Sequence, residues 1–298
     1  LTSSSGQLIG AGRLGDFLGF QYAGLFHVWR TVDNGGPQDF LEANCPEFTT
    51  FSTDPRCGDW KPLGGPRGRN QPGDLTGAFY GASKALGNVV AIERNPGDAA
   101  TAWAATTAGR VFITHNIDAV DPNTVVWQRL DSVAVATPPN AVPPPRFVTS
   151  IYPDPANLNR AWVSYSGYNS ATKDSPGHVF EVTVAGATAV WRDLHVEAGE
   201  AQELPRADLP VTDLVRDDFT GDLYASTDFG VLRGTTSNGG ATYTWTRAGA
   251  NLPFVEVAGL TIDPCSRVLY AATHGRSIWR MFMPDVKGAP VKGCPRTP

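Results

Sequence analysis

The sequence predicts an all-β fold built from tandem antiparallel units of four strands each. Three observations support this prediction. The 298-residue chain contains 32 glycines and 24 prolines, which favour short strands and tight turns over helix interiors. No stretch has the apolar spacing of an amphipathic helix. A four-part motif recurs along the chain in a fixed order, and such a repeat decides the fold class.

Each part of the motif corresponds to one strand. A first strand of pattern V-x-x-[I/L]-x-x-[D/N]-[P/D] begins at four positions, which are Val89, Val148, Val211 and Val257. An aromatic residue followed by small residues marks each second strand, at Trp103, Trp162, Tyr224 and Tyr270. A glycine then leads into a third strand, which contains Val111-Phe112, Val179-Phe180, Val231-Leu232 or Ile278-Trp279.

A tryptophan strand closes three of the four copies, at Trp127, Trp191 and Trp245. Trp60 closes an earlier partial copy, whose third strand covers residues 28–31. Four short strands in a unit of about 40 to 60 residues are typical of β-propeller blades. A single four-stranded sheet buries too little apolar surface alone, whereas stacked sheets bury both faces. We therefore predict a β-propeller that forms a single domain over residues 1–298.

About five blades are visible, and we expect them at residues 1–63, 89–130, 148–194, 211–247 and 257–283, followed by a C-terminal tail at 284–298. The first blade lacks a first strand, and the last blade ends at Met281 without a tryptophan strand. Two interpretations stay open. Either the N-terminal segment pairs into the last blade of a five-bladed ring, or the chain is part of a larger propeller with a further propeller or domain upstream.

Two turns that follow third strands carry a further motif. They read Thr31-Val-Asp33-Asn-Gly35 and, ahead of Trp245, Thr236-Ser-Asn238-Gly-Gly240-Ala-Thr242, while Thr114-His-Asn116 is a weaker copy. The chain therefore resembles the BNR/Asp-box propellers, which include sialidases, xyloglucanase-type glycoside hydrolases, sortilin-like receptors and photosystem-assembly propellers. The resemblance implies that the Asp or Asn side chain caps backbone N–H groups of the turn. It is specific for the fold and not for function. The closing stretch from Tyr270 to Trp279 is similar to secreted bacterial members.

The four cysteines form two local pairs, Cys45 with Cys57 and Cys265 with Cys294. Each pair brackets an irregular segment that contains proline, where a crosslink would restrict the unfolded chain. We expect two disulfides and an oxidising compartment, so that the protein is secreted, periplasmic or on the cell surface. Four buried thiols are the alternative.

Composition argues against several classes of function. The net charge is −5 and the basic residues are scattered, which argues against nucleic acid as a partner. No apolar stretch reaches the roughly 18 residues that span a bilayer, so a membrane-spanning chain is not expected. The five histidines are dispersed and no phosphate-loop or dinucleotide fingerprint occurs, so we expect no metal and no cofactor.

Long loops point to where binding occurs. Loops from strand 2 to strand 3, and from strand 4 to the next strand 1, should share one face of the propeller. Most of the long insertions are of these kinds, including residues 64–88, 131–145, 166–176 and 195–210. The candidate ligand-binding residues on this face are Arg110, Tyr165, Tyr168, Asp228, His274 and Arg276. Each of them has a structural alternative, as a residue that shapes a turn or carries a solvated charge.

Two hypotheses on function follow. The first is a non-enzymatic propeller on the cell exterior that binds a protein or glycan partner through the long-loop face. The alternative is a glycoside hydrolase module of the sialidase or xyloglucanase type, which needs two carboxyl groups, or a carboxyl group and a tyrosine, beside one sugar. No catalytic residue can be named from the sequence.

Overall fold

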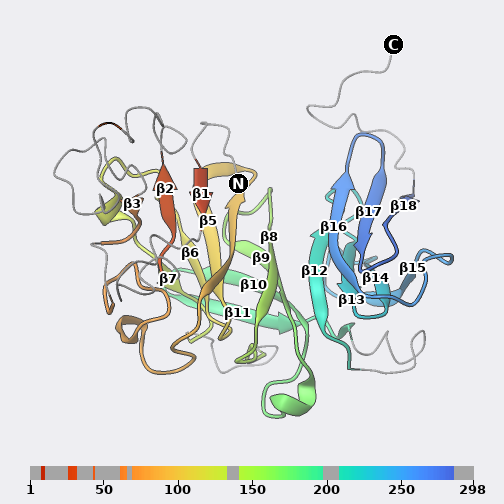
Figure 1. The fold of residues 1–298 in the computed structure, drawn as a ribbon, viewed down its shortest axis with the longest axis horizontal. Coiled ribbons are helices and arrows are strands. Elements are labelled where there is room, and N and C mark those ends of the chain that lie inside the picture. The colour runs from red at the N-terminus through yellow and green to blue at the C-terminus, as the bar shows by residue number, and fades with distance from the viewer. Residues whose placement is uncertain are drawn as a thin grey trace. The chain divides into compact units, whose positions relative to one another are not determined.

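The computed structural model describes residues 8–10, 26–31, 43, 61–65, 69–132, 141–196 and 208–284. The described chain is all-β apart from short helical turns, and its antiparallel sheets follow one another along the sequence (Figure 1). The predicted fold class, a β-propeller of antiparallel sheets, is confirmed.

Five sheets make up the described chain. The first contains three strands, β1 (Leu8–Gly10), β2 (Trp29–Thr31) and β3 (Lys61–Pro62). The second contains β4 (Val89–Asn95), β5 (Asp98–Thr106), β6 (Val111–Thr114) and β7 (Gln128–Arg129). The third contains β8 (Val148–Pro153), β9 (Arg160–Tyr165), β10 (Val179–Ala185) and β11 (Thr188–Asp193).

The fourth sheet contains β12 (Val211–Arg216), β13 (Leu223–Thr227), β14 (Gly230–Thr235) and β15 (Thr244–Ala248). The fifth has three described strands, β16 (Val257–Asp263), β17 (Val268–Thr273) and β18 (Ile278–Phe282). Three short 3-10 turns, η2 (Ala78–Tyr80), η3 (Pro122–Thr124) and η4 (Asn169–Ala171), lie in the loops. In each sheet the strands are adjacent in sequence order, as hairpins require.

The chain divides into two compact units. Unit 1 comprises Leu1–Val135, Pro153–Arg160 and Thr183–Ala189, and unit 2 comprises Ala136–Tyr152, Ala161–Val182 and Val190–Pro298. The core of unit 1 contains Phe112 and Trp127. Unit 2 has two core clusters, one around Trp162 and Trp245 and one around Tyr224 and Leu269. That residues 1–298 form one domain stays a prediction.

Three of the four second-strand aromatic residues of the repeat are core residues, and the fourth, Tyr270, is 37 % exposed. Trp103 and Tyr224 are fully buried, and Trp162 is 1 % exposed. The fourth-strand tryptophans Trp191 and Trp245 lie in β11 and β15, and Trp127 directly precedes β7. Trp60, the predicted equivalent in the first sheet, lies outside the described residues.

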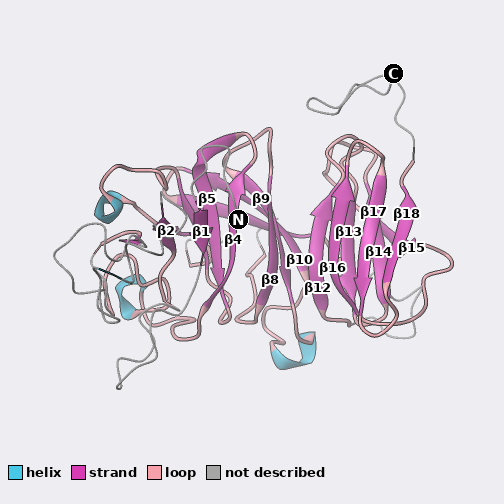
Figure 2. Ribbon diagram, turned by 45° about the horizontal axis from the view of Figure 1, so that its top comes forward, coloured by secondary structure: helices cyan, strands magenta, loops and turns pink. Residues whose placement is uncertain are grey.

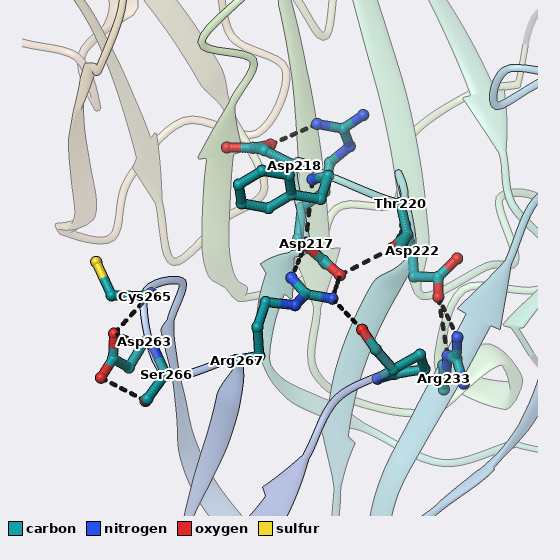
Figure 3. Close-up of polar contacts among 12 residues, drawn as sticks. Asp217, Asp218, Thr220, Asp222, Arg233, Asp263, Cys265, Ser266 and Arg267 are labelled. Atoms are coloured by element: carbon teal, nitrogen blue, oxygen red, sulfur yellow. Dashed lines mark hydrogen bonds and ion pairs between the residues drawn. The ribbon is translucent and has the colours of Figure 1, made fainter. Parts of the chain in front are cut away.

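Polar side chains secure the turn between the first and second strands of the fourth sheet (Figure 3). Arg267 contacts both carboxylate oxygens of Asp217 at 2.7 Å and donates to the Pro284 carbonyl at 2.8 Å. Asp217, which is 2 % exposed, also accepts from the Thr220 hydroxyl at 2.9 Å and the Phe219 amide at 3.1 Å. Burial raises the pKa of Asp217, but these hydrogen bonds outweigh burial and hold the pKa below its usual value. The carboxylate is therefore charged and satisfied, and it ties the fourth sheet to the turn before β17.

Candidate functional site

Several loops of unit 2 emerge at the same end of their sheets. In an antiparallel sheet the turn from strand 2 to strand 3 and the loop that leaves strand 4 lie at one end. In unit 2 these are the turn between β13 and β14, the loop from β15 to β16, and the turn between β17 and β18. They carry Asp228, Glu256 and His274, which we call the loop cluster.

His274 and Glu256 form a direct contact. The His274 Nδ1 atom lies 3.1 Å from Glu256 Oε2, and the His274 amide donates to the Glu256 carbonyl at 2.9 Å. Both side chains are open to solvent, with exposed fractions of 79 % and 46 %. The pair therefore presents a carboxylate and an imidazole to solvent in a geometry fixed by the backbone.

Asp228 completes the loop cluster from the neighbouring hairpin. Burial raises its pKa, and the negative charge of Glu256 raises it further. The Thr227 hydroxyl donates to the Gly230 carbonyl at 3.1 Å and accepts from the Phe229 amide at 3.1 Å, which fixes the turn that carries Asp228. Gly230 has a φ of 118°, a conformation that favours glycine. Asp228 thus holds a proton more tightly than a free aspartate does.

Arg276 lies on the same turn as His274. The residue is exposed, and its carbonyl accepts a 2.9 Å hydrogen bond from the indole of Trp279. Gly275 and Ser277, on either side of Arg276, have φ values of 75° and 66°. The turn is therefore sharp, and it carries one basic residue two positions after His274.

Tyr168 and Tyr165 have different environments. Tyr168 is 44 % exposed and precedes η4, whereas Tyr165 is the last residue of β9, is fully buried, and packs edge-on against Phe180 at 5.5 Å between ring centroids. Of these two candidates, only Tyr168 can meet a ligand from solvent without rearrangement.

A polar pair of a buried histidine and a partly exposed aspartate organises the loop that carries Tyr168. His178 Nε2 lies 2.8 Å from Asp208 Oδ1, and the two Asp208 oxygens accept from the Asn169 amide at 2.9 and 3.0 Å. The Asn169 side chain accepts from the Gly177 amide at 2.7 Å. Asp208 lies three residues before the start of β12, so these hydrogen bonds hold the Tyr168 loop to the segment that leads into the fourth sheet.

Arg110 belongs to unit 1 and is fully buried. Its five N–H groups all donate to backbone carbonyls, which belong to Leu75, Gly77, Gly81 and Ser83, at 2.7 to 3.2 Å. Burial, with a contribution from Arg129, lowers the pKa of Arg110 to about 10. Because every guanidinium donor is used, this arginine clamps the loop between the first and second sheets and has no donor left for a ligand.

The structure thus brings His274 into contact with Glu256, whose charge also acts on Asp228. Arg276 lies two residues after His274 on the same turn. Sequence reasoning missed Glu256, which lies one residue before β16. Its loop runs from a fourth strand to the next first strand, a kind of loop in which the sequence predicts binding residues. Sequence reasoning also missed the pairing of His178 with Asp208, and no local signal links two residues that are 30 positions apart.

Among the described residues, no group of three or more His, Cys, Asp or Glu side chains could hold a metal ion. No helix in the described part of the chain is long and apolar enough to cross a membrane. Cys45, Cys57 and Cys294 lie outside the described residues. The predicted disulfides, Cys45 with Cys57 and Cys265 with Cys294, therefore stay predictions.

No family model and no curated protein matches the chain. Among solved structures, it is similar to the β-propeller domain of Cps50 (Swd1) from Myceliophteria thermophila, at 12 % identity and a TM-score of 0.46, over 69 % of this chain and 55 % of that one. It is similar to YCF48 from Cyanidioschyzon merolae, at 14 % identity and a TM-score of 0.48, over 87 % of this chain and 63 % of that one. It is also similar to an ancestral GH74 enzyme, at 16 % identity and a TM-score of 0.45, over 84 % of this chain and 25 % of that one.

The chain thus spans between a quarter and two thirds of the length of these three structures. At such identities the similarity concerns the fold alone. The sheets define the class of this protein, which is a β-propeller protein.

Proposed function

We propose that this chain is a non-catalytic interaction propeller of the cell exterior, which binds a protein or glycan partner through the loop end of unit 2. The observation that carries the proposal is the loop cluster. Asp228, Glu256 and His274 come from three loops of two sheets and meet at one end. Residues brought together from separate loops on a rigid scaffold are the usual arrangement of a binding site.

Aromatic side chains at the same kind of loop support this proposal. Phe254, in the loop from β15 to β16, is 57 % exposed and lies under the Arg247 guanidinium, 4.0 Å from the ring centroid. Tyr168 is 44 % exposed. Exposed aromatic rings beside carboxylates can stack on a sugar ring or anchor a protein partner while the carboxylates accept hydrogen bonds.

The test is a binding screen against arrayed glycans and defined extracellular proteins, with loop-cluster variants as probes. For any binder found, we expect Glu256→Gln and His274→Ala to weaken binding about tenfold or more. Asp218→Asn is the matched control, because Asp218 is an exposed carboxylate in the opposite turn, between β12 and β13. Binding that Glu256→Gln and His274→Ala leave unchanged would contradict the proposed site.

A glycoside hydrolase module is the second candidate, and one observation favours it. Asp228 has a raised pKa beside a second carboxyl group, that of Glu256. Retaining and inverting glycosidases use such a pair, one group as acid and one as carboxylate. We expect no release from a fluorogenic sialoside, because in the described part of the chain Arg276 is the one arginine on the three loops that carry the loop cluster. Turnover that is abolished by Asp228→Asn or Arg276→Ala would replace the binding proposal with the enzyme.

We further propose that the third-to-fourth-strand turns are of the Asp-box type. The Asn238 side chain supports this, because its oxygen accepts from the Thr242 amide at 3.0 Å, and the Thr236 hydroxyl accepts from the Gly240 amide at 3.0 Å. Asn116 likewise accepts from the Val126 amide at 3.0 Å.

Export to an oxidising compartment rests on the two cysteine pairs. Two disulfides predict that thiol titration finds no reactive thiol in the unfolded, non-reduced protein. After reduction the same titration should find four thiols. Free thiols before reduction would contradict this part of the proposal.

A further inference from the structure

A single aspartate closes the loop that joins the second and third strands of the third sheet. This loop, the Tyr168 loop, covers residues 166–178, and its helical turn η4 is the cyan turn below β8 in Figure 2. Both Asp208 carboxylate oxygens accept from the Asn169 amide, near the start of the loop. Asp208 Oδ1 also lies 2.8 Å from Nε2 of His178, the last residue of the loop. One carboxylate therefore holds the two ends of the loop together.

The second ring nitrogen of His178 also faces an oxygen. Nδ1 lies 3.4 Å from the carbonyl oxygen of Tyr165, the last residue of β9. A neutral imidazole has one N–H group and one lone pair, whereas an imidazolium has two N–H groups. The neutral ring must therefore turn its lone pair towards one of these two oxygens, while the imidazolium can donate to both.

The two members of the pair differ in their access to water. His178 is fully buried, whereas the Asp208 side chain is 35 % exposed. Burial disfavours the imidazolium, and a carboxylate at 2.8 Å favours it, so two opposing effects act on a group that titrates near pH 6.5 when unperturbed. Because Asp208 keeps part of its hydration, the carboxylate can stay charged when it separates from the ring.

Two further charged groups lie next to the Tyr168 loop, and they have opposite signs. Arg146 donates to the carbonyl of Gly177. Asp193 lies so close to Gly177 that a Cβ added to this glycine would be 2.7 Å from Asp193 Oδ2. Arg146 opposes a positive charge on the next residue, His178, and Asp193 favours it. Their effects oppose each other, and Asp208 is the charge in direct contact with the ring.

Three other titratable side chains near this loop are exposed, so solvent screens their charges. Lys173 and Asp174 lie on the loop itself and are exposed. The His195 side chain, whose Nδ1 is 3.5 Å from Asp193 Oδ2, is 73 % exposed. The buried ring of His178 is therefore the group at this loop whose change of charge alters a contact that water cannot replace.

We propose that the His178–Asp208 pair is a pH-sensitive latch of the Tyr168 loop. Below neutral pH the imidazolium donates to Asp208 and to the Tyr165 carbonyl, and the loop is closed. As the pH rises, His178 loses a proton, the ion pair becomes a weaker neutral hydrogen bond, and a lone pair faces an acceptor. The loop then opens more often, and Tyr168, its exposed aromatic residue, is no longer held in one position.

Closure of the loop and protonation of His178 favour each other. The closed loop provides both acceptors, so the ring holds its proton more tightly when the loop is closed than when it is open. The stabilisation of the closed loop is therefore complete at low pH and is lost as the pH rises through the titration of the ring. A charge-assisted hydrogen bond is about twice as strong as a neutral one, so we expect the population of the open loop to change about three- to tenfold.

Hydrogen exchange of the full chain, followed by mass spectrometry from about pH 5.5 to about pH 8.5, measures how often the loop opens. After correction for the intrinsic pH dependence of exchange, protection of a peptide that covers residues 166–178 should fall about three- to tenfold as the pH rises. A peptide that covers residues 223–235, in β13 and β14, is the internal reference and should keep its protection. The latch lies outside the loop cluster and this test needs no ligand, so its outcome is independent of the binding screen.

Two histidine variants assign the effect to one ring. His178→Gln keeps a donor for Asp208 but cannot titrate, so protection of its loop should be independent of pH and equal to that of wild type at high pH. His195→Asn is the matched control, because His195 also faces a carboxylate but is exposed. Asparagine tolerates the φ of 52° at this position, and the loop of this variant should keep the wild-type pH profile. Circular dichroism and melting temperature check that both variants fold.

An NMR titration of the His178 ring is the second measurement, and it does not need a histidine variant. Asp208→Asn, at a partly exposed side chain, should lower the pH at which the ring titrates by about one unit or more, because it removes the opposite charge. Wild-type protection that does not change with pH, a wild-type pH profile in His178→Gln, or a ring titration that Asp208→Asn leaves unchanged would each overturn the proposal. Loss of the pH profile in His195→Asn would overturn it as well.

Discussion

Replacing Arg267 with methionine should destabilise unit 2 strongly. The substitution removes both 2.7 Å contacts to Asp217 and leaves a carboxylate that is 2 % exposed without its counter-charge. Loss of one partner from a buried ion pair costs about 3 to 5 kcal/mol. Asp217 keeps its hydrogen bonds from Thr220 and from the Phe219 amide, which places the expected loss near the lower limit, at about 3 kcal/mol.

Methionine is the suitable replacement because Arg267 has a φ of 56°. An unbranched side chain bears about the same strain there as arginine, so the difference reports the lost charge and hydrogen bonds. Urea unfolding followed by tryptophan fluorescence gives the free energy of unfolding. Arg276→Met, at an exposed arginine, is the control and should change that free energy by less than about 0.5 kcal/mol.

The pH dependence provides a second readout. The pKa of Asp217 is lower in the folded chain than its unfolded value of about 3.9, so its contribution to stability is present above pH 4 and disappears as the pH falls further. The difference between wild type and Arg267→Met should therefore shrink at low pH. A loss under about 1 kcal/mol at pH 7, or a difference that does not change with pH, would refute this account of the ion pair.

Three more predictions concern single side chains. Trp245→Phe should cost about 1 to 2 kcal/mol in urea unfolding, because the buried Leu194 carbonyl loses its donor; equal stability would contradict that role. Arg110→Lys should lower the free energy of unfolding by about 3 kcal/mol, because three donors cannot replace five; a loss below about 1 kcal/mol would show that the clamp is dispensable. Asp228→Asn should stabilise the protein at pH 7 and have no such effect below pH 4, since a raised folded pKa means that ionisation of Asp228 opposes folding. A destabilised Asp228→Asn variant at pH 7 would reverse that assignment.

The sequence predicts the sheets well because the repeat supplies independent copies of one pattern. Aromatic residues precede small residues in all four copies, and Trp103, Trp162 and Tyr224 are core residues of second strands, while Tyr270 in the last copy is 37 % exposed. Agreement among copies separates this pattern from chance alternation. A single copy, such as the short first sheet, would not have been convincing alone.

The site was harder to predict, because its residues meet through loops. Asp228 and His274 were identifiable from their turns, but the contact between His274 and Glu256 depends on how two loops lie against each other. Arg110 shows the reverse problem. It lies in the expected kind of turn, yet its side chain points to the carbonyls of a loop about 30 residues earlier, which no local pattern encodes.

Aspartates at the two ends of the fourth sheet have pKa values that shift in opposite directions. In the turn between β12 and β13, Asp217 is buried, hydrogen-bonded and charge-paired, so that its pKa falls. At the loop end, Asp228 lies near another carboxylate and its pKa rises, while Glu256 and His274 stay exposed. A fully satisfied network stabilises a fold, whereas groups held in solvent near a like charge lower stability and persist where they serve a function. This contrast, more than the presence of acidic residues as such, is the physical reason for proposing that binding occurs at the loop end of unit 2.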